Sequence, residues 1–168
     1  MLLSEFGIAP YGIDISQEAI TQARALAHSY NAPCDFRVYD GEHIPFDNDF
    51  FDFTMSYGVL DSLPFELAKR LVGEIARVSK TYFFCSLIGE DSASGFSNIT
   101  QERFTDEVEV QEAHEKGTIQ SFFDMDKIRS LFANTPFTLI WGEKKQAFNL
   151  LTQGIQSRYY IVLRKDKE

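Results

Sequence analysis

The feature that most constrains the fold of this sequence is a pair of short β-rich segments separated by a helical pattern. The segments are "APYGIDI" (residues 9–15) and "CDFRVYD" (residues 34–40), and each has an aspartate at or near its end. Between them, Ser16 can cap a helix, and apolar residues then recur at three- and four-residue spacing up to Asn31. A helix that connects two strands in this way predicts parallel strands in one sheet.

The rest of the chain continues the alternation and then departs from it. We expect, in chain order, a strand at 50–56, a helix at 64–79, a strand at 80–89, a short helix at 102–108, a short strand at 118–123, a helix at 124–134 and strands at 137–143 and 157–165. No long helix separates the last two strands, which predicts antiparallel neighbours joined by a connection at 144–154. The fold class is therefore α/β, a mostly parallel sheet flanked by helices with an antiparallel C-terminal strand pair.

Length and composition restrict the class of protein further. The 168 residues are enough for one domain, and the net charge of −9 argues against a nucleic-acid partner, because such binding depends on clustered Lys and Arg. No apolar run approaches the roughly 18 residues of a membrane-spanning helix, so we expect no membrane partner. Cys34 and Cys85 lack the spacing of a metal site. Buried thiols in a reducing cytoplasm are the favoured interpretation, which predicts a cytoplasmic protein.

Three stretches together resemble a known family. They are "YGIDIS" (11–16), "VYDGEHIPFDNDFFDFTMSYGVLDSLP" (38–64) and the C-terminal strand pair. Over nearly its whole length the chain is similar to class I S-adenosylmethionine-dependent methyltransferases. The resemblance implies a Rossmann-like sheet with S-adenosylmethionine bound at the carboxyl ends of its strands. "HEKGTIQSFF" (114–123) resembles a segment common in members that act on small molecules, so a small-molecule methyl acceptor is expected.

The resemblance assigns the cofactor contacts to the ends of three strands. Asp14 is expected to accept hydrogen bonds from both ribose hydroxyls, although it could instead help to cap the following helix. Asp40 is expected to accept from the adenine amino group, with the backbone of Gly41 and Glu42 close by; an ordinary turn is the alternative. The same resemblance places Ile15 against the adenine face, where a core isoleucine would look identical in sequence.

The remaining expected site residues face the methionine end of the cofactor and the acceptor. Ser56 lies where the family holds the methionine end, although a plain loop explains the neighbouring glycine equally well. The candidate acceptor-facing residues are Tyr57, Asp61 and His114, and none of them is singled out as a catalytic base. His114 falls in residues 89–122, an insertion expected to form a substrate lid, and a solvated surface histidine is the alternative there. No metal-ligand cluster is visible.

The sequence departs from the family in one respect. The family's first strand and its glycine-rich loop have no counterpart, and residues 1–7 match only the end of the helix that follows that loop. We therefore expect residues 1–168 to form a single, incomplete methyltransferase domain, truncated or given with a misassigned start. Its exposed sheet edges are expected to allow homo-oligomers.

Two other functions remain open. A non-catalytic remnant of the family could act as an interaction module through the same edges. An NAD-binding half-domain is the weakest alternative, because "GEHIPFDNDFFDF" does not belong to that class.

Overall fold

The structure is a computed structural model that describes residues 6–95, 104–110, 117–151 and 154–166. The chain divides into two compact units, one ending at Phe46 and the other beginning at Asp47. The first contains β1 (Tyr11–Asp14), α2 (Gln17–Ser29) and β2 (Asp35–Val38). The second contains β3 (Phe51–Tyr57), η1 (Leu60–Ser62), α3 (Phe65–Val78), β4 (Ser79–Ile88), η2 (Glu90–Gly95), β5 (Glu107–Glu109), β6 (Ile119–Ser121), α4 (Met125–Phe132), β7 (Phe137–Phe148) and β8 (Ile155–Lys165).

The first unit is a parallel strand pair with its connecting helix. β1 pairs with β2 from Tyr11 opposite Asp35 to Asp14 opposite Val38. Helix α2 begins after Ser16, whose hydroxyl oxygen accepts a hydrogen bond from the backbone N–H of Ala19 (3.2 Å). Parallel pairing and the order of the strands bring Asp14 and residue 40 to the same end of the sheet.

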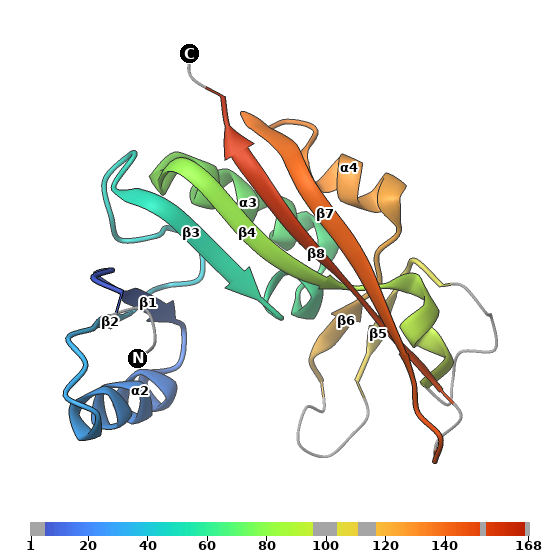
Figure 1. The fold of residues 1–168 in the computed structure, drawn as a ribbon, viewed down its shortest axis with the longest axis horizontal. Helices are drawn as coiled ribbons and strands as arrows, with labels where there is room; N and C mark the ends of the chain where they lie inside the picture. The colour runs from blue at the N-terminus through green and yellow to red at the C-terminus, as the bar shows by residue number, and fades with distance from the viewer. Residues whose placement is uncertain (1–5, 96–103, 111–116, 152–153, 167–168) are drawn as a thin grey trace. The chain divides into compact units, whose positions relative to one another are not determined.

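The second unit is built on a four-stranded sheet with the order β3-β4-β8-β7 (Figure 1). β3 and β4 are parallel, whereas β8 runs antiparallel to both β4 and β7. β3 is an edge strand of this sheet. A second, two-stranded sheet is formed by β5 and β6.

The core of the second unit lies on one face of the four-stranded sheet. Alternate residues of β4, namely Phe83, Cys85 and Leu87, are completely buried. Helices α3 and α4 cover this face (Figure 1), and the ring of Phe83 lies 6.3 Å from that of Phe132 in α4. Tyr82, which points to the opposite face of β4, is exposed.

The small β5–β6 sheet is joined by polar contacts to the start of α3 and to η1. The backbone N–H of Phe65, at the start of α3, donates to Oε1 of Glu107 in β5, where the positive end of the helix dipole favours an anion. In β6, Nε2 of Gln120 donates to the backbone carbonyl of Asp61 (2.8 Å). Residues expected in the insertion thus contact the segment that follows β3.

The expected fold class is confirmed, including the parallel early strands and the antiparallel C-terminal pair. Two expectations were wrong. Residues 107 and 108, expected at the end of a helix, belong instead to strand β5, because this segment pairs with β6. Residues 144–148 continue β7 instead of forming a connection, because each pairs with a residue of β8. The helix end expected at residues 1–5 lies outside the described residues.

The cysteines differ in burial. Cys85 is fully buried in β4, and burial raises the pKa of its thiol, whereas Cys34 is only partly buried before β2. None of the helices in the described part of the chain has the length and hydropathy that a membrane crossing requires.

Replacing Phe83 with alanine should strongly destabilise the second unit. Its side chain is fully buried between the rings of Phe132 and Phe137, and such a cavity costs about 3–5 kcal/mol. The matched control is Tyr82→Ala on the exposed face, which should cost about 1 kcal/mol or less. Urea unfolding of both variants measures the difference, and equal losses would contradict this assignment of the core.

Candidate functional site

Asp14, the last residue of β1, combines a local structural contact with an open carboxylate oxygen. Oδ1 accepts a hydrogen bond from the backbone N–H of Ser16 (2.8 Å), which holds the turn into α2. Oδ2 has no hydrogen-bond partner within the described residues, and the side chain is exposed. The helix cap itself is Ser16, so Asp14 is not needed as the cap and can still accept hydrogen bonds from a ligand.

Asp40 repeats this arrangement after β2. Its Oδ1 accepts hydrogen bonds from the backbone N–H groups of Glu42 and His43, each at 2.8 Å. These bonds, that from His43 first and that from Glu42 second, lower the pKa of Asp40, so the carboxylate is ionised near neutral pH. The second carboxylate oxygen has no partner among the residues that the structure describes. The N–H of Glu42 is occupied by this turn.

An apolar side chain lies beside these two carboxylates. Ile15 directly follows Asp14 and is 67% exposed, so it is not the core residue that the sequence left as an alternative. A Cβ built on Gly41 would lie 3.4 Å from Cγ2 of Ile15, which places the two strand-end segments in contact. Gly41 also has a φ of +86°, a conformation that favours glycine.

The backbone of Tyr39 also joins the ends of the two strands. Its backbone N–H donates to the carbonyl oxygen of Asp14 (3.1 Å). Burial raises the pKa of Tyr39, and the charges of Asp14 and Asp40 raise it further. The first unit therefore brings Asp14, Ile15, Asp40 and Gly41 to one edge.

The second unit has its own polar cluster, centred on the buried side chain of Asp61 in η1. Oδ2 of Asp61 accepts hydrogen bonds from the backbone N–H of Ile88 (2.9 Å) and from Nη1 of Arg158 (2.9 Å). Oδ1 is buried without a hydrogen-bond partner in the described part of the chain. Burial raises the pKa of Asp61, opposed by the positive charge of Arg158 and by the bond from Ile88.

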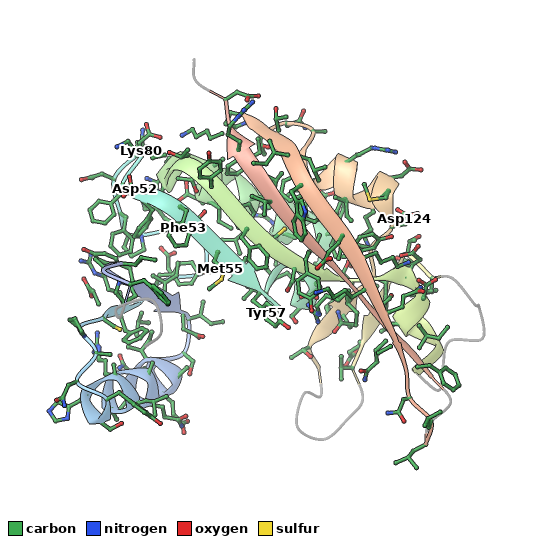
Figure 2. The ribbon with its side chains drawn as sticks, viewed as in Figure 1. Asp52, Phe53, Met55, Tyr57, Lys80 and Asp124 are labelled. Atoms are coloured by element: carbon green, nitrogen blue, oxygen red, sulfur yellow. The ribbon has the colours of Figure 1, made fainter. Side chains whose placement is uncertain are left out.

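Two tyrosines extend this cluster across the open face of the sheet. Tyr57, at the end of β3 (Figure 2), is 59% exposed, and its ring centroid lies 6.5 Å from that of Tyr160 in β8. The nearby side chain of Tyr57 is the first cause of a raised pKa at Tyr160. The neighbouring Ser56 points to the buried side, and its hydroxyl has no partner among the described residues.

The predicted site residues are therefore divided between the units. Asp14, Ile15, Asp40, Gly41 and Glu42 belong to the first, and Ser56, Tyr57 and Asp61 belong to the second. His114 lies outside the described residues. No group of metal-ligating side chains occurs in the described ranges.

Sequence reasoning missed Arg158 and Tyr160. The alternation of "SRYYIVLRK" (157–165) does indicate that both lie on the face opposite Tyr159 and Ile161. The sequence contains no indication that this face meets Asp61, 97 positions earlier in the chain.

The comparisons with known proteins agree with this architecture. Residues 1–85, half of the chain, match the family described as a methyltransferase domain. The chain therefore belongs to this family of S-adenosylmethionine-dependent methyltransferases, as the sequence predicted. No curated protein matches the sequence.

Solved structures show the same fold. One is an S-adenosylmethionine-dependent methyltransferase from Methanosarcina mazei, with a TM-score of 0.80 and 22% identity over 99% of this chain and 86% of that one. Another is magnesium protoporphyrin IX methyltransferase from Synechocystis PCC 6803 with bound S-adenosylmethionine (TM-score 0.67, 15% identity, 98% of this chain and 63% of that one). A third is the complex of a putative methyltransferase from Haloferax volcanii with the Trm112 activator (TM-score 0.69, 17% identity, 99% and 76%).

Replacing Asp61 with asparagine should change how stability depends on pH. When burial raises the native pKa of a carboxyl, the native state is more stable with that carboxyl protonated than with it ionised. The stability of the parent relative to Asp61→Asn should therefore fall as the pH rises from the ordinary pKa of 3.8 through the raised native value. Urea unfolding of both proteins over a pH series measures this difference.

The baseline variant for that series is Asp52→Asn, because the Asp52 side chain is 90% exposed. If the parent instead gained stability over Asp61→Asn as the pH rose, the pairing with Arg158 would outweigh burial and the assignment would be wrong.

Proposed function

We propose that this protein transfers a methyl group from S-adenosylmethionine to a small-molecule acceptor. The observation that carries the proposal is the exposed side chain of Ile15, which lies within contact distance of Gly41. Asp14 directly precedes Ile15 and Asp40 directly precedes Gly41. In each of these acids one carboxylate oxygen accepts hydrogen bonds from the backbone. An exposed apolar surface flanked by two carboxylates fits the adenosine part of this cofactor, which has an aromatic base, an amino group and two ribose hydroxyls.

Asp14 would bind the ribose. A carboxylate with one open oxygen at a strand end can accept from a vicinal diol, as acids at this position do in dinucleotide-binding domains. The bond from Ser16 to Oδ1 fixes the direction of the side chain before the ligand arrives, which reduces the entropy lost on binding.

Asp40 and Ile15 would bind the adenine. The two backbone N–H groups bonded to Oδ1 of Asp40 orient its carboxylate toward an amino donor. Ile15 supplies an apolar surface for the base, and the absence of a side chain at Gly41 leaves room beside it. The bound cofactor would supply an electrophilic methyl group on its sulfonium.

The acceptor would bind in the second unit. Tyr57 and Asp61 lie around Arg158 at the carboxyl ends of β3 and β4, and Ser56 remains the candidate for the methionine end of the cofactor. We assign the lid role to residues 89–122 as part of the same proposal, with β6 contacting Asp61 through Gln120. A reducing cytoplasm suits the free thiols of Cys34 and Cys85.

One observation favours a second candidate, an interaction module that self-associates. Phe53, Met55 and Tyr57 follow one another along β3, all exposed (Figure 2), and β3 is an edge strand of its sheet. Edge strands with exposed apolar residues promote association. Light scattering distinguishes the interaction module from the methyltransferase, because the module must form an oligomer whether or not the cofactor binds.

The methyltransferase proposal is tested by Asp14→Asn. Asparagine keeps an acceptor for Ser16 but removes the charge offered to the ribose. A hydrogen bond to a charged group is worth about 1.5–3 kcal/mol, so affinity for S-adenosylhomocysteine should fall by roughly 10-fold or more. The melting temperature without ligand should barely change, because the side chain is exposed.

Isothermal titration of the parent, Asp14→Asn and the control Asp52→Asn gives the result. The control is expected to bind like the parent. Equal affinities for all three proteins would refute the ribose assignment.

A further inference from the structure

Arg158 lies in the region proposed for the acceptor, but the proposed function gives it no role of its own. Its Nη1 donates to Oδ2 of Asp61 (2.9 Å) and to Oγ of Ser86 (3.1 Å). The Asp61 side chain is 2% exposed, whereas that of Arg158 is 27% exposed. One end of the guanidinium is therefore fixed inside the protein while the residue remains accessible to a ligand.

The rest of the guanidinium makes no hydrogen bond to the part of the chain that the structure describes. Neither Nε nor Nη2 of Arg158 makes a hydrogen bond within the described residues. These two nitrogens form one edge of the planar group, and that edge matches the two oxygens of a carboxylate with two parallel N–H···O bonds. Because Asp61 and Ser86 hold Nη1, the orientation of this edge is set in advance.

An aromatic surface accompanies the open edge. Cζ of Arg158 lies 5.4 Å from the ring centroid of Tyr57, which is 59% exposed. Tyr57 and Tyr160 lie at the same level of the sheet, because both pair with Ser86 on the strand between them. A flat ligand can thus lie on tyrosine while its acidic group meets the arginine.

Charge alone would not select such a ligand. The buried Asp61 neutralises Arg158, and Glu143 pairs with the neighbouring Lys145 at 2.8 Å. The net local charge is therefore close to zero, and the chain as a whole is acidic. Discrimination must come from the paired donors of the Nε–Nη2 edge, which distinguish a planar carboxylate from an amide of the same shape.

We propose that Arg158, oriented by Asp61 and Ser86, binds a carboxylate on a planar methyl acceptor that stacks on Tyr57. This rests on the proposed function, since it names the acceptor class of that site. Arg158 would act as a specificity residue. The reacting group of the acceptor would be a different atom from the carboxylate that Arg158 engages.

The probe is benzoate, with benzamide as its neutral counterpart. In ¹⁵N-labelled protein, benzoate should produce a saturable shift of the Arg158 Nε–H resonance in the millimolar range, and benzamide should bind at least about 10-fold more weakly. The resonance is assigned from its absence in Arg158→Lys. That variant keeps the positive charge beside Asp61 but loses the paired donors, so it should lose the preference for benzoate.

The matched control is Lys145→Gln, which removes a cation next to the same tyrosines and should keep the preference. Melting curves show whether each variant is folded. Benzoate and benzamide binding equally, no saturable shift with benzoate, or a preference that survives in Arg158→Lys would each overturn the proposal.

A separate titration with S-adenosylhomocysteine tests the methyltransferase function independently of the carboxylate site at Arg158. If the cofactor product binds but benzoate shows no preference, the carboxylate assignment falls and the methyltransferase proposal stands. If the benzoate preference is found without cofactor binding, the proposed function falls and the carboxylate site stands.

Discussion

The second unit depends on a buried carboxylate that joins four elements. Asp61, in η1 after β3, accepts from the end of β4 through Ile88 and from β8 through Arg158, and its backbone carbonyl accepts from Gln120 in β6. Removing one partner of a buried ion pair typically costs about 3–5 kcal/mol. The same contacts fix the guanidinium at the carboxyl ends of β3 and β4, so one interaction sets both the local structure and the surface that we propose for the acceptor.

In the first unit, too, an acidic side chain makes a structural contact at the end of each of two parallel strands. In Asp14 and in Asp40, one carboxylate oxygen shapes the turn that follows the strand, and the other has no partner among the described residues. A side chain already held by its own backbone needs little further ordering to bind a ligand. The exposed side chain of Ile15 lies between these acids, where we propose that it packs against the adenine ring.

Local patterns predicted the helices and parallel strands well, because Ser16 caps α2 and apolar periodicity marks α3. The strands that depend on partners distant in the sequence were harder to predict. Residues 107–109 pair with β6, and residues 144–148 pair with β8, and neither segment carries a strong strand pattern of its own. For the candidate site, Asp14 and Asp40 could be predicted because an acid ends β1 and another follows β2 closely. Arg158 could not, because its meeting with Asp61 depends on a sheet order that no local pattern contains.

A crystal structure of the protein with S-adenosylhomocysteine tests the central claim most directly. The account predicts both ribose hydroxyls within hydrogen-bond distance of the Asp14 carboxylate, the adenine ring packed on Ile15 beside Gly41, and its amino group at Asp40. A ligand bound elsewhere, with Asp14 and Ile15 still facing solvent, would contradict it.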